Sequence, residues 1–161
     1  MAVVEEHPVV EVGLEQADRY EFRASFPGVS FPAWLVDEPP PLGGARGPNP
    51  SRTLAVALGH CLSSSLFYGL ERARVASSPI RTRVRVDVGR NDRGRLRVRT
   101  VEVEIEAAPL RPEDRERFDH VVSIFEDYCT VSAAVREGIR VTARVHPPTG
   151  SGSTNPSVPP S

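Results

Sequence analysis

The chain contains no lysine at all: its 20 basic residues are all arginine, they face 21 carboxylates, and the formal net charge at pH 7 is −1. Proteins that bind nucleic acid usually carry a clear basic excess, so nucleic acid is not an expected partner. Cysteine is almost as scarce, being present only as Cys61 and Cys129. A chain of 161 residues forms one domain by length and buries a core without needing disulfides or a metal.

The N-terminus lacks the basic flank and the long apolar core of a secretory signal. It reads "MAVVEEHPVVEVGLEQ", with acidic residues where a signal needs basic ones. We therefore expect a cytoplasmic location, where two cysteines rest as thiols and a disulfide between them is transient.

Long apolar runs are also missing, apart from "TLAVALGHCLSSSLFYGL" at residues 53–70, which carries no formal charge. A membrane span needs about 20 mostly apolar residues, whereas this run is short and contains His60, two glycines and three consecutive serines. The run predicts a long buried helix that packs against its own sheet or against a partner chain, and no membrane segment.

Hydrophobic periodicity predicts an α+β fold with a largely antiparallel sheet. Residues 9–16 and 20–26 alternate as two strands joined near 17–19, and "SFPAWLV" adds a possible third. After a Pro- and Gly-rich loop come a helix at 51–74 and a hairpin with a turn at 91–94 and a bulge near Arg99. The rest predicts a helix at 111–129, a short helix at 131–136 and a last strand at 138–146.

The helix at 111–129 opens with Pro112 and acidic residues, which suit a first turn. Its predicted inner stripe is formed by Phe118, Val121, Val122, Phe125, Tyr128 and Cys129. The domain is expected to span residues 1–146. The tail, 147–161, has no core-forming residues and is expected to be disordered.

The residues alone leave two interpretations of the cysteines open. Free cysteine often serves as a small buried apolar residue, and a pair distant in the sequence can also do redox chemistry. A zinc site is disfavoured because there is no CxxC motif and neither His60 nor His120 lies at a ligand spacing from a cysteine. We predict no bound metal.

Two segments resemble the signatures of the OsmC/Ohr family, the osmotically inducible protein C and organic hydroperoxide resistance proteins. "DEPPPLGGARGPNPSRTLAVALGHCLSSSL" is similar to the first, in which an Asn-Pro pair opens the central helix and a cysteine follows about three turns later. "YCTVSAAVREGIRV" is similar to the second, in which a cysteine is followed by a short helix, a glycine and a strand. The resemblance covers roughly residues 9–146.

The resemblance implies an intertwined homodimer in which the central helices are buried against the partner chain. It also implies a thiol-dependent reductase of organic hydroperoxides, active in oxidative-stress defence without a bound cofactor. In that scheme Cys61 attacks the peroxide as a thiolate and becomes a sulfenic acid, and Cys129 condenses with it to a disulfide. A cellular dithiol then reduces the disulfide.

One departure from the family pattern concerns the position after Asn49-Pro50. Peroxidatic members usually carry a carboxylate there, which holds an arginine beside the reactive thiolate, whereas this chain has Ser51. The resemblance places that arginine in the N-terminal hairpin region, where Arg19 and Arg23 are the candidates and Arg19 is nearer the turn. Asp37 and Glu38 are substitute carboxylates, and His60 adjoins Cys61, although loop solvation and helix packing explain these residues equally well.

The loss of the carboxylate supports an alternative of a different class. The chain would then be a non-catalytic OsmC-fold dimer that binds a small apolar or thiol-reactive ligand. A purely structural dimer with inert buried cysteines is a third alternative.

Overall fold

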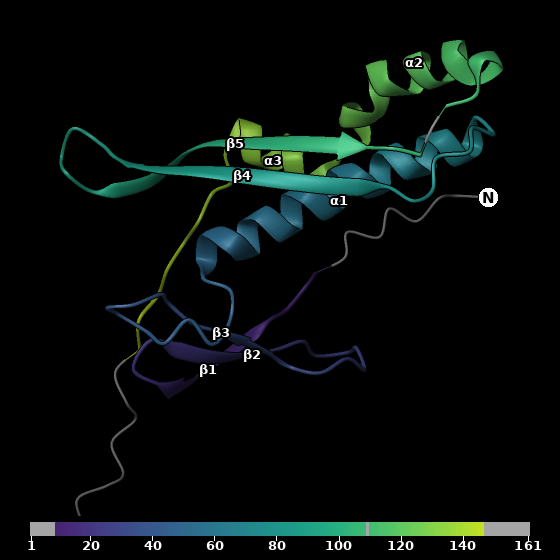
Figure 1. Cartoon of the computed structure of the whole chain (residues 1–161). Coiled ribbons are helices and arrows are strands. Elements are labelled where there is room, and N and C mark those ends of the chain that lie inside the picture. Colours follow the sequence, from purple (N-terminus) through teal and green to yellow (C-terminus); the bar gives the residue numbers. More distant parts are fainter. Residues whose placement is uncertain (1–8, 109, 147–161) are drawn as a thin grey trace, which may run out of the picture.

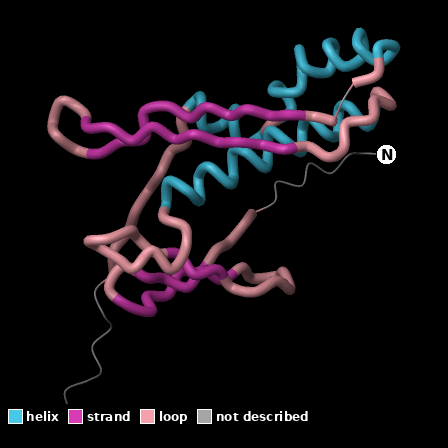
Figure 2. Tube along the Cα trace, viewed as in Figure 1, coloured by secondary structure: helices cyan, strands magenta, loops and turns pink. Residues whose placement is uncertain are grey.

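The computed structural model describes residues 9–108 and 110–146, so the predicted disordered tail lies outside the described residues. The fold is α+β, as predicted, with antiparallel sheets and three α-helices (Figures 1 and 2). In chain order the elements are β1 (Gly13–Asp18), β2 (Glu21–Ser25), β3 (Trp34–Val36), α1 (Pro50–Arg72), β4 (Arg81–Arg90), β5 (Leu96–Glu106), η1 (Pro112–Asp114), α2 (Arg115–Ile124), η2 (Phe125–Tyr128) and α3 (Thr130–Glu137).

The first sheet has the order β1-β2-β3, with both pairs antiparallel. The predicted hairpin and the possible third strand are therefore confirmed. Strand β1 begins at Gly13 rather than at residue 9, because its partner β2 ends at Ser25, directly opposite Gly13.

The second sheet is the hairpin β4–β5, in which three arginines of β4 lie opposite glutamates of β5, as in Arg83 opposite Glu104. Asp87 lies opposite Thr100 and Val88 opposite Val98, which leaves Arg99 as the extra residue of a β-bulge. The predicted bulge is confirmed, and α1 runs alongside this hairpin in Figure 1.

Helix α1 starts where its capping residues place it. The side chain of Asn49 accepts a hydrogen bond from the Arg52 N–H at 3.0 Å, and Pro50 occupies the first helical position. A row of leucines, spaced four apart, then points into the core; these are Leu58, Leu62, Leu66 and Leu70.

Two glycines let other elements approach α1 closely. A Cβ atom on Gly59 would lie 2.7 Å from a methyl of Val84 in β4, and one on Gly69 would lie 2.7 Å from a methyl of Val121 in α2. Both distances are shorter than carbon atoms tolerate. The glycines therefore set how tightly the hairpin and α2 pack against the central helix.

The predicted burial of α1 on nearly all sides is not found within the single chain. Val56 is 53% exposed and Tyr68 is 59% exposed, while the leucine row is buried. The helix has the length and composition of a membrane span, with mean hydropathy 1.3, but a core helix of an α+β domain passes the same test. Burial against a partner chain remains a prediction.

The helix predicted at 111–129 is α-helical only as α2, and the short 3-10 segments η1 and η2 flank it. Val121 and Cys129 are buried as predicted, whereas Tyr128 is 71% exposed and Val122 is 41% exposed, so the predicted stripe is wrong at these two positions. The 3-10 turn places about three residues per turn instead of 3.6, which moves Tyr128 off the stripe. Val122 is turned away from the core because its neighbour Val121 points into it.

The strand predicted at 138–146 is also wrong for the single chain. This segment has no regular structure and exposes Val141 and Val145 almost fully. It leaves α3 and runs toward the β1–β2–β3 sheet (Figure 1), but neither described sheet includes it. A strand needs a neighbour for its backbone hydrogen bonds, and no strand of the same chain supplies one in the described residues.

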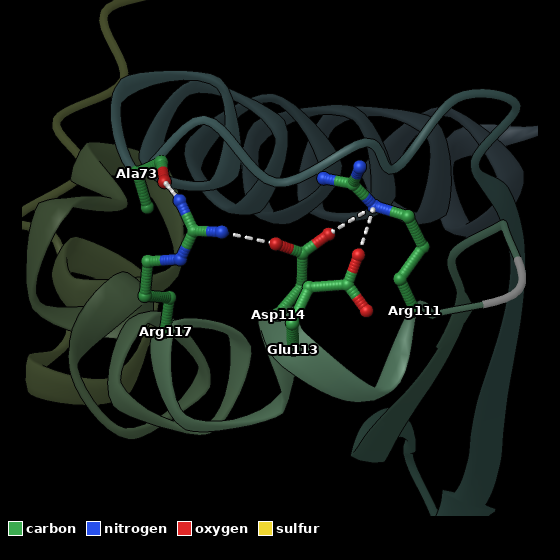
Figure 3. A network of polar contacts seen from close by, with 5 residues as sticks. All are labelled: Ala73, Arg111, Glu113, Asp114 and Arg117. Atoms are coloured by element: carbon green, nitrogen blue, oxygen red, sulfur yellow. Dashed lines mark hydrogen bonds and ion pairs between the residues drawn. The ribbon is translucent and has the colours of Figure 1, made fainter.

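A buried carboxylate anchors the start of α2 (Figure 3). The Asp114 side chain is 1% exposed and accepts hydrogen bonds from the guanidinium groups of Arg111, at 2.7 Å, and Arg117. Arg117 also donates to the carbonyl oxygen of Ala73, just beyond α1, at 2.9 Å. Asp114 thus links η1, α2 and the end of α1.

We predict that Asp114→Asn lowers the free energy of unfolding by about 2–4 kcal/mol, because it leaves two arginines without their buried partner. The matched control is Asp119→Asn, which removes an exposed carboxylate paired with Arg115 at 2.7 Å and should cost about 0.5 kcal/mol. Urea unfolding of both variants checks this. Equal losses in the two variants would contradict the role given to Asp114.

Candidate active site

The fold brings the two cysteines together. Cys61 lies in the middle of α1, and Cys129 lies between η2 and α3, the two segments that pack against α1 after the chain has passed through β4, β5 and α2. Their Sγ atoms are 2.8 Å apart and both thiols are free. A disulfide bond is about 2.05 Å long, so a small movement joins the two sulfurs.

The two thiols differ in access. Cys129 is fully buried, with 0% exposure, whereas Cys61 is half-buried. A small molecule that enters the site therefore meets the sulfur of Cys61 first.

The two thiols also differ in their pKa values. Burial raises the pKa of Cys129, but its interactions with the Cys61 thiol, with the Ser132 side chain and with the N–H groups of Ser132 and Val131 more than offset this and lower it. Burial also raises the pKa of Cys61, and its hydrogen bond to Cys129 raises it further. The pair acts as one coupled acid, whose first negative charge is favoured on Cys129.

The Ser132 side chain favours this preference, because it lowers the pKa of Cys129 alone, whereas the N–H groups of Val131 and Ser132 lower the pKa of both thiols. Cys129 is the N-cap residue of α3, where the helix dipole and free N–H groups favour negative charge. Its sulfur does not form a full capping hydrogen bond, but the N–H dipoles of Val131 and Ser132 still lower the pKa of this thiol.

The predicted arginine is not beside Cys61 in the single chain. Arg19 lies at the β1–β2 turn, where its guanidinium stacks on the ring of Tyr20 at 5.9 Å. Neither Arg19 nor Arg23 is among the groups that shift the pKa of Cys61. The role of Arg19 therefore stays a prediction that depends on a second chain.

Asp37 acts as a brace for the loop before α1. Its carboxylate is buried and accepts the backbone N–H groups of Gly44, at 2.9 Å, and Arg46, at 3.1 Å. The hydrogen bond from Arg46 lowers the pKa of this carboxyl group, and the one from Gly44 adds to the effect against the opposing burial. These contacts favour the loop interpretation of Asp37 over a role as substitute for the missing family carboxylate.

Two features of the site region were missed by sequence reasoning. The first is Ser132, which is 3% exposed and whose hydroxyl lies 3.4 Å from the Cys129 carbonyl oxygen. The sequence pattern that could have indicated it is a small polar residue in the first helical turn after a cysteine. The second is an ion pair of 2.9 Å between Arg46 and the largely buried Glu21, which ties the loop before α1 to β2. Opposite charges so far apart in the sequence gave no signal.

A groove of about 440 Å³ runs between α1 and the α2–η2 segment. One end of the groove lies near the cysteine pair, because two lining residues are close to the cysteines in the chain. Ser65 is one helical turn beyond Cys61, and Tyr128 directly precedes Cys129. Its floor is apolar, with Val121 and Phe125 among the lining residues. In the described part of the chain, no three His, Cys, Asp or Glu side chains converge as a metal site.

Comparison with known proteins agrees with this fold and this thiol pair. The sequence profile of the family described as OsmC-like protein matches residues 43–144. No curated protein matches the chain.

Several solved structures share the fold. An OsmC-like protein of unknown function from Vibrio cholerae is 13% identical, with a TM-score of 0.64 and coverage of 79% of this chain and 93% of that one. An OsmC-like protein from Mycoplasma pneumoniae is 15% identical, with a TM-score of 0.62 and coverage of 81% and 89%. An organic hydroperoxide resistance protein of Bacillus subtilis is 15% identical, with a TM-score of 0.59 and coverage of 80% and 90%.

The structure is thus an α+β domain that brings together two cysteines distant in the sequence, Cys61 on the central helix and Cys129 at the start of α3. The profile match covers more than half of the chain. The chain belongs to the OsmC-like protein family.

We predict that Cys129→Ser lowers the pH at which Cys61 reaches half of its maximal rate of alkylation. Two of the causes that raise the Cys61 pKa, its hydrogen bond to Cys129 and the charge on Cys129, are then removed, while burial remains. A lower pKa means that the Cys61 thiolate forms at lower pH. Iodoacetamide labelling followed by mass spectrometry across pH measures the midpoint, and an unchanged or higher midpoint would contradict the coupling.

Proposed function

We propose that the protein is a thiol-dependent reductase of organic hydroperoxides, in which Cys61 is the nucleophile and Cys129 resolves it. The observation that carries the proposal is the Sγ–Sγ distance of 2.8 Å between a reachable thiol and an enclosed one. Family membership supports the same chemistry, and one solved neighbour is called an organic hydroperoxide resistance protein.

The reaction needs no bound cofactor. The Cys61 thiolate attacks the terminal peroxide oxygen, the O–O bond breaks, and the alkoxide takes a proton to leave as an alcohol. Cys61 becomes a sulfenic acid. The Cys129 thiolate then attacks the Cys61 sulfur, a disulfide forms, and hydroxide leaves and is protonated to water. A dithiol reductant, in a thiol-reducing compartment such as the cytoplasm, returns both thiols.

The groove between α1 and the α2–η2 segment suits the organic part of the substrate. Its apolar floor would accept a hydrocarbon chain, while Tyr68, Arg72 and His120 on its lining suit a polar end group. This favours a hydroperoxide with an apolar tail over hydrogen peroxide.

We also propose that the working unit is a homodimer. The single chain leaves two apolar surfaces uncovered: one side of α1, with Val56 among its residues, and a groove of about 410 Å³ on the first sheet, lined by Leu14 and Trp34 among others. Surfaces of this kind mark interfaces. A second copy would cover both and would give the extended segment 138–146 a neighbour.

Arg19 is proposed to act on Cys61 across this interface. Within the described part of the single chain no cation lowers the Cys61 pKa, whereas a peroxidatic cysteine must ionise readily. An arginine from the second copy would supply the missing positive charge, and Ser51 would hold it less firmly than the usual family carboxylate. We therefore expect a lower peroxide-reduction rate than in family members that have the carboxylate.

We predict that one equivalent of cumene hydroperoxide converts the reduced protein to the Cys61–Cys129 disulfide, with the loss of the mass of two hydrogens. Cys129→Ser should instead hold a Cys61 sulfenic acid, because the resolving thiol is absent. Intact-mass spectrometry distinguishes the two products. If both proteins stay reduced, the catalytic proposal fails and the alternative of a binding dimer that retains the fold is left.

We predict that Arg19→Gln slows the oxidation of Cys61 at least tenfold, since a placed charge often contributes that much to a reaction, whereas Arg23→Gln has little effect. Arg19→Gln and Cys61→Ser chains, unfolded and refolded together, should regain peroxide reactivity. In the mixed dimer one site then has both Cys61 and Arg19. No recovery on mixing would contradict an action of Arg19 across the interface.

A further inference from the structure

We propose that the reductant of the oxidised protein attacks the sulfur of Cys61, that Cys129 is the leaving group, and that Ser132 is the positioning residue that holds the departing thiolate. This inference rests on the proposed function, because it concerns the disulfide that the function generates. It assigns a direction to the reductive half of the cycle and a role to a buried serine.

Access fixes which sulfur is attacked. A thiolate that cleaves a disulfide approaches one sulfur from the side opposite to the other sulfur. Cys129 has no exposed surface, whereas Cys61 is half-buried and accessible. Neither cysteine lines the groove between α1 and the α2–η2 segment, whose end at Ser65 lies one helical turn from Cys61.

The electrostatic arrangement favours the same direction. The leaving thiol in disulfide exchange departs faster when its thiolate is more stable. In the disulfide neither sulfur carries a proton, so the hydrogen bond between the two thiols is absent. The first N–H groups of α3 lower the pKa of both cysteines, and the Ser132 side chain lowers the pKa of Cys129 alone. Expulsion of Cys129 therefore gives the more stable thiolate, and expulsion of Cys61 gives the less stable one.

The step balances without any component besides a dithiol. One thiolate of the dithiol forms an S–S bond with Cys61 while the Cys61–Cys129 bond breaks, and the electron pair of that bond stays on Cys129 as a thiolate. The second thiol of the dithiol then loses its proton and attacks the reductant's own sulfur in the mixed disulfide. Cys61 is released as a thiolate, takes up a proton, and the cyclic disulfide of the reductant leaves.

Ser132 is suited to this role by its placement. It lies in the first turn of α3, three residues after Cys129, and is 3% exposed, so water does not compete for its hydroxyl. Its hydroxyl is 3.4 Å from the Cys129 carbonyl oxygen in the reduced protein, a long and therefore weak hydrogen bond. Rotation about one bond lets the same hydroxyl turn toward the sulfur when that sulfur carries the charge.

The test begins with a disulfide made by diamide, so that it does not depend on any reaction with peroxide. The oxidised protein is mixed with 2-mercaptoethanol, a monothiol, and quenched with N-ethylmaleimide within the first turnover. Trypsin places Cys61 and Cys129 in separate peptides, 53–72 and 118–136. We expect the mercaptoethanol adduct on 53–72 and the maleimide on 118–136. The reverse assignment, or failure of diamide to form the disulfide, would overturn the inference.

The role of Ser132 is read from the rate of that first exchange. Ser132→Ala should slow it roughly fivefold, because a hydrogen bond to the leaving thiolate is lost, while Ser132→Thr, which keeps the hydroxyl, should stay near the original rate. Ser123→Ala is the control, since that exposed hydroxyl bonds only to the His120 carbonyl oxygen. An unchanged rate in Ser132→Ala, or equal slowing in the alanine and threonine variants, would refute the positioning role.

Discussion

The close packing of α1 against the segments that follow β5 is the contact on which the site depends. The leucine row of α1 supplies the buried surface, and Gly69 lets Val121 approach within a distance that a side chain would forbid. Asp114 fixes the start of α2 to the end of α1 through Arg117. Because α2, η2 and α3 are continuous, this contact also determines where Cys129 meets Cys61.

Much of the fold followed from local patterns in the sequence. Neighbouring residues encode the alternation of β4 and β5, including the bulge at Arg99, and the structure confirms it. They also encode the start of α1 at Asn49-Pro50, which the structure confirms as well. Tyr128 was misplaced because a 3-10 turn changes the spacing within an otherwise regular stripe. The segment 138–146 has a strand pattern, but pairing depends on a neighbour that the chain itself does not provide.

The site was predictable only in part. The cysteines stood out because they are scarce, and the resemblance to the family paired them; their 2.8 Å approach depends on tertiary packing that no local pattern encodes. The partition of charge toward Cys129 was unexpected. It arises from the Ser132 side chain, which lowers the pKa of Cys129 alone and is buried beside that cysteine.

The single chain has an incomplete site and incompletely covered surfaces, and the two facts have one explanation in the proposed dimer. Cys61 has a raised pKa and no cation among the groups that shift it, while Arg19 lies on a sheet whose apolar groove is open. The groups that lower the pKa of the buried Cys129, by contrast, all belong to the same chain. In the proposed mechanism, the resolving and leaving-group chemistry is therefore built into the protomer, and activation of the nucleophile is assigned to the dimer.

The most direct test of the central claim, that the two cysteines form a working redox pair, is steady-state consumption of tert-butyl hydroperoxide with dithiothreitol as the dithiol. We predict catalytic consumption by the unaltered protein, over many equivalents, and none above the thiol background for Cys61→Ser. Background consumption by the unaltered protein, or equal consumption by Cys61→Ser, would contradict it.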